Sequence, residues 1–259
     1  MIREFIESWA LAHNAYLAGW LIAAALALLG VLIVAKDQIF LGAAVTEAST
    51  LGAALAMWLG TTVGSTAMHW HENDLLLRGL AVLFSVAATL LTVRGGGPGR
   101  ETHEAITGWI FLVSSAGAIL LVSHTPHGLE EIRRLLSSSI IGAQSSDVVM
   151  FTIILLATSA LLLMFRRPIL MTVLDPQTAA ALGVRTKLWS LGLAAWIGLA
   201  IGLSLRVSGT LYTFACLVLP APWRYNPLRS PAGTGSPLDP LLGIQIIAFA
   251  AVWVGLARW

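Results

Sequence analysis

The chain has 259 residues, of which 57% are hydrophobic and only 11% are charged, and its formal net charge is +2. Soluble domains carry roughly 25% charged residues, so this composition excludes an ordinary soluble protein, and the small charge gives no reason to expect a nucleic-acid partner. Apolar runs recur at about the 20 residues that a helix needs to cross a bilayer. The sequence therefore predicts an all-α integral membrane protein, a polytopic helical bundle of about seven to eight spans, with a short cytoplasmic helix.

The first fourteen residues differ from the apolar runs that follow them. Apolar side chains recur there at i, i+3, i+4 and i+7, with charged residues between them, at Ile2, Phe5, Ile6 and Trp9. This pattern predicts an amphipathic helix at the membrane interface. The first span is expected at 15–35. The next segment, 39–68, is rich in Ala, Gly, Ser and Thr, and small residues let helices pack closely in lipid, so we expect it at the centre of the bundle.

Glu47 is the one acidic residue deep in a predicted span, which makes it a candidate metal ligand. A charged side chain at that depth costs roughly 2.5–3.5 kcal/mol on insertion scales, so it should face a cavity or a partner. The alternative is a protonated carboxyl group, or one that is hydrogen-bonded to the hydroxyl of Thr46 or Thr50.

His69 and His71 lie in a polar stretch, 69–74, that we predict as an outer turn. Two histidines at i and i+2 do not share a face of a helix, but in an extended turn they could meet. The pair is thus a candidate transient metal site, and the alternative is a pair of solvated loop histidines. Further spans follow, separated by a cytoplasmic loop at 94–104 and an outer segment at 123–147; they are predicted at 75–93, 105–122, 148–165 and 188–205.

The connection between two of these spans, 166–187, is short and polar. Basic residues beside membrane segments prefer the cytoplasmic side, and this connection carries Arg166, Arg167, Arg185 and Lys187. Asp175 is a good N-cap, Pro176 suits the first helical position, and Gly183 suits the residue past a helix C-terminus. The predicted helix is far shorter than the roughly 12–15 residues that a helix needs alone in water. It must therefore be held by its own membrane helices or by a cytoplasmic partner.

The composition changes after Pro220. Five prolines fall between 222 and 240, which is typical of a loop. The segment 210–220 is too short to span alone, and the apolar run 241–257 predicts a last span. We therefore divide the chain into an interfacial segment (1–14), a membrane domain (15–220), and a Pro-rich loop with the last helix (221–259).

These features resemble the permease subunits of ABC transporters for divalent metals, the zinc/manganese/iron uptake family. That family has a D-x-x-x-A-x-x-x-G segment after two basic residues, matched here by Asp175, Ala179 and Gly183. An L-R-V-x-G-x-L block ending in L-P-A follows, matched by 205–211 and 217–221. In the family the first segment is the coupling helix, which fits a groove of the ATPase subunit. The resemblance, which runs from the first span to Pro220, thus implies coupling residues at Asp175, Ala179, Ala180 and Gly183.

The family also has a G-D-A-x-S-H-A motif whose Asp and His contribute to the metal path. In this chain Ala43 stands at the Asp position and Glu47 stands at the His position. The resemblance therefore implies a path that passes Glu47. A carboxylate suits a hard cation better than zinc, which prefers nitrogen and sulfur ligands.

The function that the resemblance implies is that of a multi-pass inner-membrane permease for divalent metals of the Zn/Mn/Fe class. The implied partners are a second permease copy, a cytoplasmic ABC ATPase and an extracytoplasmic metal-binding protein. No G-x-x-x-x-G-K-[ST] loop is present, so we expect this chain to bind no cofactor and ATP to be held by the partner. Two alternatives remain: an ATP-independent cation carrier or channel that uses Glu47, and a non-transporting structural relative.

Overall fold

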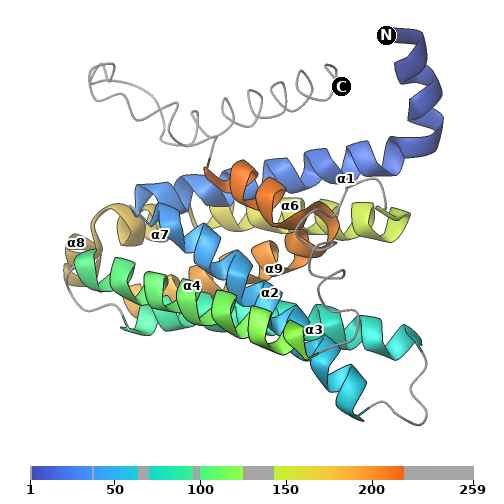
Figure 1. The fold of residues 1–259 in the computed structure, drawn as a ribbon. Helices are drawn as coiled ribbons and strands as arrows, with labels where there is room; N and C mark the ends of the chain where they lie inside the picture. The colour runs from blue at the N-terminus through green and yellow to red at the C-terminus, as the bar shows by residue number, and fades with distance from the viewer. Residues whose placement is uncertain (1, 37, 64–69, 96–99, 125–142, 219–259) are drawn as a thin grey trace.

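A computed structural model describes residues 2–36, 38–63, 70–95, 100–124 and 143–218 (Figure 1). The helices in these ranges are α1 (Ile2–Ala35), α2 (Ile39–Val63), α3 (Trp70–Gly95), α4 (Arg100–Ser123), α6 (Ser145–Met164), α7 (Arg166–Leu174), α8 (Pro176–Ala181) and α9 (Thr186–Val218). Six of them, α1, α2, α3, α4, α6 and α9, are long and apolar enough to cross a membrane. The predicted all-α membrane class is confirmed, and the last predicted span, with the rest of 221–259, lies outside the described residues.

Helix α2 occupies the centre of the bundle. It packs against α3, α4 and α9, and Figure 1 shows it crossing between them. The main apolar core joins α1, α2, α6 and α9 through side chains that include Leu26, Val45, Phe151 and Ile201. The central position that we expected from the small residues of this segment is thus confirmed.

Close packing of small residues also joins α3 to α9, which the sequence analysis did not foresee. Gly198 and Gly202 lie one turn apart on α9. A Cβ added at Gly198 would come 2.6 Å from Thr89 Oγ1 and 2.8 Å from Val86 Cα, and one added at Gly202 would come 3.0 Å from Val82 Cα. The Ser85 hydroxyl donates a hydrogen bond to the Gly198 carbonyl. The two helices therefore approach each other almost backbone to backbone.

This contact predicts opposite effects of one substitution at two glycines of α9. Gly198→Ala should lower the free energy of unfolding by about 1–3 kcal/mol, because the methyl group overlaps the backbone of α3. Gly192→Ala is the matched control: no atom lies within 4 Å of its added Cβ, and alanine in a helix should gain roughly 0.5–1 kcal/mol. Thermal unfolding in the same detergent measures both, and equal shifts for the two variants would contradict the packing.

At the N-terminus the structure has one helix where we expected two elements. Helix α1 runs without a break from Ile2 into the span that begins at His13. Figure 1 shows its first turns bent away from the rest of the helix. Residues 2–14 of the predicted segment 1–14 are thus helical as predicted, but they are the start of α1 rather than a separate helix, and their place at the membrane interface remains a prediction.

Helix α9 contains the predicted span at 188–205 and, as far as Val218, the separate short segment predicted at 210–220. Both belong to one interrupted element, broken at Gly209, whose backbone (φ 76°, ψ 170°) is not helical. Side chains hold the break: Thr213 Oγ1 donates to the Gly209 carbonyl at 2.8 Å and lies 3.0 Å from Ser208 Oγ. Figure 1 shows the part after the break folding back along the bundle, where a Cβ at Gly30 would overlap the Leu217 carbonyl.

Candidate functional site

The short helix α8 has both of the end signals that the sequence predicted. The Asp175 carboxylate accepts hydrogen bonds from the backbone N–H groups of Gln177 (3.1 Å) and Thr178 (3.0 Å) and from the Thr178 hydroxyl (2.6 Å). Pro176 is the first helical residue. Gly183, just past the end, has φ +80°, which L side chains rarely adopt. The predicted helix with its N-cap and its terminating glycine is therefore confirmed.

One residue attaches α8 to the bundle, and the others face outward. Ala179 is fully buried, whereas Asp175 to Thr178 and Ala180 to Gly183 are exposed. Leu182 is 65% exposed, although a leucine normally prefers the interior. Figure 1 places α8 at one end of the bundle, beside the start of α9. The helix is thus anchored on one side and presents small and apolar side chains on the other.

Helix α7 supports α8, and the sequence analysis missed it. Its Ile169 and Val173 are buried against Leu32 of α1 and Leu193 of α9. Together with Thr172, these two residues have the i, i+3, i+4 spacing of a buried helical face, which could have revealed the helix. The predicted polar connection is therefore a platform of two short helices.

The cap makes the first turn of α8 sensitive to acid. The Thr178 hydroxyl, and then the backbone N–H groups of Thr178 and Gln177, hold the pKa of Asp175 below its ordinary value. A lowered pKa means that the cap is complete above the usual Asp range, about pH 4, and is lost as the pH falls through the folded-state value. Hydrogen exchange at Gln177 and Thr178 should therefore quicken below that pH relative to exchange in the unfolded chain. Asp175→Asn should keep the cap without this pH dependence, and an identical pH profile in the variant would contradict the assignment.

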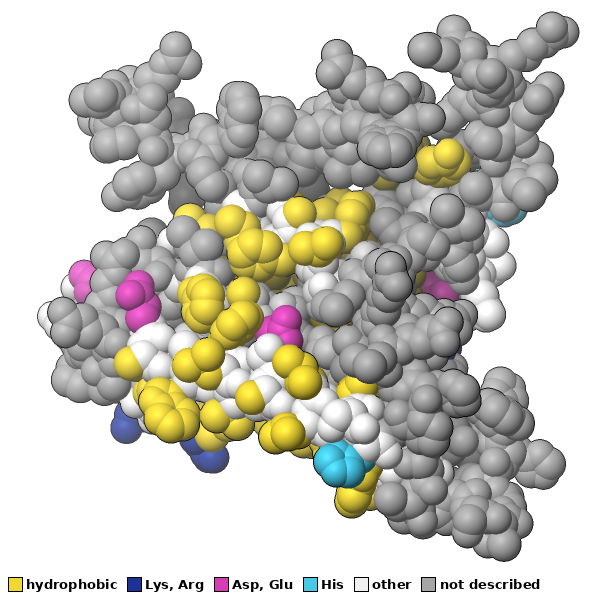
Figure 2. All heavy atoms as spheres, in the orientation of Figure 1, with side chains coloured by type: hydrophobic (Ala, Val, Ile, Leu, Met, Phe, Trp, Pro, Cys, Tyr) yellow, Lys and Arg dark blue, Asp and Glu magenta, His cyan; other side chains and the backbone are white. Residues whose placement is uncertain are grey.

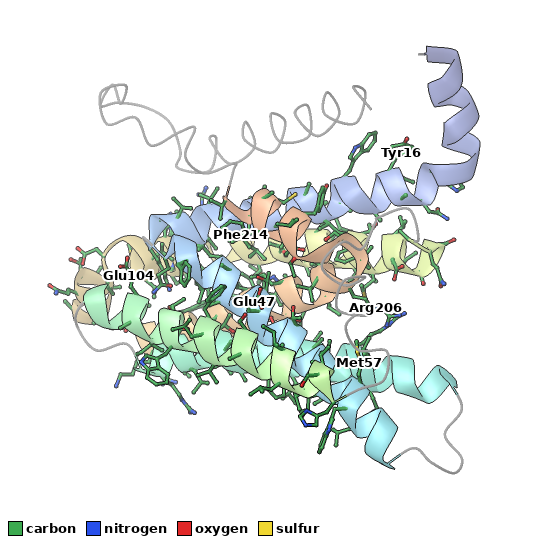
Figure 3. The ribbon with its side chains drawn as sticks, viewed as in Figure 1. Tyr16, Glu47, Met57, Glu104, Arg206 and Phe214 are labelled. Atoms are coloured by element: carbon green, nitrogen blue, oxygen red, sulfur yellow. The ribbon has the colours of Figure 1, made fainter. Side chains whose placement is uncertain are left out.

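Glu47 lies about a third of the way along α2 and is half-buried. Figure 3 labels it there, and at the same place Figure 2 shows an acidic side chain that reaches the surface among apolar and small side chains. The Thr46 hydroxyl donates to the Ala43 carbonyl at 2.8 Å, and the Thr50 hydroxyl donates to the Thr46 carbonyl at 3.0 Å. Both protons are used within the helix, so neither hydroxyl donates to Glu47.

Within the described part of the chain, the Glu47 carboxylate has no hydrogen-bond or ion-pair partner. The same ranges contain no group of three or more His, Cys, Asp or Glu side chains that could hold a metal ion together. A site with a single carboxylate ligand among these residues holds a cation only weakly, because affinity depends on the number of ligands. Such a site suits a cation in transit better than a permanently bound one. Ser49, which the sequence analysis passed over, also has a buried hydroxyl without a partner among these residues.

The two candidate histidines do not join Glu47. His69 lies outside the described residues. His71 belongs to the first turn of α3, which begins at Trp70, so the predicted outer turn is wrong for 70–74. Glu47 lies sixteen residues before Val63, the end of α2, a helical distance of about 24 Å. Because α3 starts beyond that end of α2, any metal contact at His71 would be a separate station.

Comparison with known proteins adds a family match over most of the chain. The family model described as the ABC 3 transport family matches residues 8–231. This range contains every described transmembrane helix except the first turns of α1, and it contains Glu47 and α8.

Three known proteins are similar in sequence. A manganese transport system membrane protein, MntB, of Synechocystis is 24% identical over 47% of this chain and 39% of its own length. A manganese import system permease protein, ScaB, of Streptococcus parasanguinis is 23% identical over 87% and 76%. A probable metal transport system membrane protein of Thermotoga maritima is 22% identical over 80% and 68%.

One solved structure has a similar fold. It is PsaBC from Streptococcus pneumoniae in complex with Fab, with a TM-score of 0.75 and 19% sequence identity. The match covers 99% of this chain and 86% of that chain. The similarity extends over the whole arrangement of the membrane helices.

Proposed function

Since this chain belongs to the ABC 3 transport family, we propose that it forms the membrane path of an ABC importer for divalent metal ions. The chain is a multi-pass membrane protein with six described helices of spanning length. Its relatives include permeases named for manganese. The chain belongs to a family of transporters, and its sequence has no recognisable phosphate-binding loop. Both observations support the role of a permease subunit rather than that of an enzyme.

The observation that carries the proposal is the exposed, capped helix at the end of the bundle. Helix α8 has six residues, too few to be stable in water alone, yet its ends are fixed by Asp175 and Gly183. A protein that only needed to connect two spans could do so with a loop. We infer that α8 is the coupling helix and that Ala180 and Leu182 enter a groove of a separate ATPase subunit. Ala179 anchors the helix from behind.

The transported ion is proposed to pass Glu47. Its carboxylate lies on the central helix with no partner among the described residues, and a charge at that depth needs a compensating cation or water-filled path. Carboxylate oxygen suits manganese and other hard divalent cations, whereas imidazole suits zinc. The metal is thus expected to be manganese-like, with His69 and His71 as an outer station.

Alternating access would come from movement of two permease copies relative to each other, driven by the ATPase docked on α8. This chain would supply the path and the docking helix, the ATPase would supply ATP hydrolysis, and an extracytoplasmic protein would deliver the metal. ATP is therefore a cofactor of the partner and not of this chain.

A pull-down tests this assembly. The tagged chain would be purified from its native membrane in mild detergent and the co-purifying proteins identified by mass spectrometry. We expect an ABC ATPase and a metal-binding lipoprotein or periplasmic protein in stoichiometric amounts. A folded preparation that brings down neither would count against the importer.

A further inference from the structure

The two spans that flank α7 and α8 are joined by an aromatic pair at the membrane boundary. Phe165 directly follows α6, and Trp189 lies in the first turn of α9. Their ring centroids are 5.1 Å apart with an interplanar angle of 52°. Trp side chains prefer the level of the lipid headgroups, and Trp189 holds Phe165 beside it. The pair therefore marks the membrane surface and draws the ends of the two spans together.

Four cations lie next to this pair in the sequence. Arg166 and Arg167 follow Phe165, Arg185 and Lys187 precede Trp189, and all four are exposed. The only acidic residue between 166 and 187 is Asp175, whose carboxylate is engaged in capping α8. Figure 1 places α8, and with it this connection between α6 and α9, at one end of the bundle. The segment 166–187 thus carries a net positive charge with no free carboxylate of its own, and Glu104 of α4 lies at the same end of the bundle (Figure 3).

Exposed apolar side chains adjoin the cations on the membrane side. Leu163 and Met164 at the end of α6 are 63% and 78% exposed, and Leu188 of α9 is 60% exposed. Each lies within two residues of the aromatic pair. These side chains lie at the ends of two spans, where the acyl chains of lipids reach them, whereas a free anion such as phosphate would contact the cations alone. An amphiphile would satisfy both.

We propose that this surface binds an anionic phospholipid. The phosphate lies among Arg166, Arg167, Arg185 and Lys187, and the acyl chains lie along Leu163 and Leu188. The site stands at the exits of two spans, in the plane of the headgroups, whereas α8 projects beyond it. A lipid bound there braces the base of α8, whether or not the chain couples to an ATPase.

Native mass spectrometry of the full chain in detergent tests the site with phosphatidylglycerol and phosphatidylcholine of identical acyl chains. The wild type should retain phosphatidylglycerol in preference. Each basic residue near an anionic surface contributes about a fivefold factor in affinity, so Arg166→Gln with Arg185→Gln should weaken phosphatidylglycerol binding about 25-fold. Arg167→Gln with Lys187→Gln should do the same. Inorganic phosphate in excess should not displace the lipid.

The matched control removes two charges at the same end of the bundle. Arg94 lies in the last turn of α3 and Arg100 is the first residue of α4, so Arg94→Gln with Arg100→Gln tests a general loss of positive charge and should leave lipid binding nearly unchanged. Equal retention of the two lipids by the wild type, or equal losses in the control and site variants, would overturn the proposal. Variants that keep the lipid but lose a co-purifying ATPase would assign these cations to that partner and overturn it too.

Discussion

Leu182→Asp is expected to abolish stable association of the chain with its ATPase and, with it, ATP-driven metal uptake. Leu182 is 65% exposed on α8, so the substitution should leave the fold intact and alter only the docking surface. A carboxylate forced into a groove that receives an apolar side chain is left buried and unpaired. Such a charge costs 2–5 kcal/mol or more at interfaces, an affinity loss of roughly 30-fold or greater. Co-purification and ATPase-dependent uptake measure the two consequences.

Two further variants distinguish the contribution of the Leu182 side chain to docking from that of the conformation of α8. Leu182→Met keeps an apolar side chain of similar size and should associate normally. Gly183→Pro with Ala180→Asp should also abolish association, because proline cannot adopt φ +80° and lacks the N–H group that Gly183 donates to the Ala180 carbonyl at 3.0 Å. If the Leu182→Asp variant has native thermal stability and still associates fully with the ATPase, α8 is not the coupling helix. That result would not affect the membrane fold.

Features encoded by neighbouring residues could be predicted from the sequence. The spans follow from apolar length, and the ends of α8 follow from Asp175, Pro176 and Gly183, since caps depend on side chains two or three positions away. The central place of α2 followed from its small residues. The cap signals depend on neighbouring residues, and the apolar length depends only on the thickness of the bilayer. Both can therefore be interpreted from a single sequence.

Features that depend on distant contacts could not be predicted in the same way. The fold-back of α9 requires a non-helical backbone at Gly209 and a contact between Leu217 and Gly30 of α1. No signal in the neighbouring residues predicts that contact. The outer turn expected at 69–74 is wrong for 70–74 because helix α3 includes these polar residues, and polarity alone does not end a helix. For Glu47, the sequence predicted that a charge within a span needs a partner or a cavity. Only the structure shows that the hydroxyl groups of Thr46 and Thr50 donate to backbone carbonyls of α2 and not to Glu47.

Glu47→Gln is expected to lower manganese uptake at least about 10-fold, the low end of the effects seen when a metal site loses a supporting group. Glutamine has nearly the same shape but carries no charge, so it offers the cation a weaker oxygen ligand at this position of α2. Uptake would be measured in proteoliposomes that contain the complex recovered from native membranes, with ATP supplied on the ATPase side. ATPase association and thermal stability should stay at wild-type levels, because Glu47 belongs to α2, which is not among the helices that pack closely on α8.

The variants Glu47→Asp and Glu47→His test the chemistry rather than the presence of a side chain. Aspartate keeps the carboxylate and should retain much of the manganese uptake that glutamine loses. Histidine restores the residue of the resembling G-D-A-x-S-H-A motif, and because imidazole favours zinc over harder cations, it should raise the ratio of zinc to manganese uptake. If all three variants transport both metals as the wild type does, Glu47 lies beside the path rather than on it, and the ligands must be sought elsewhere in the chain. If glutamine alone fails and histidine changes the preference, one side chain of α2 sets which metal the permease prefers.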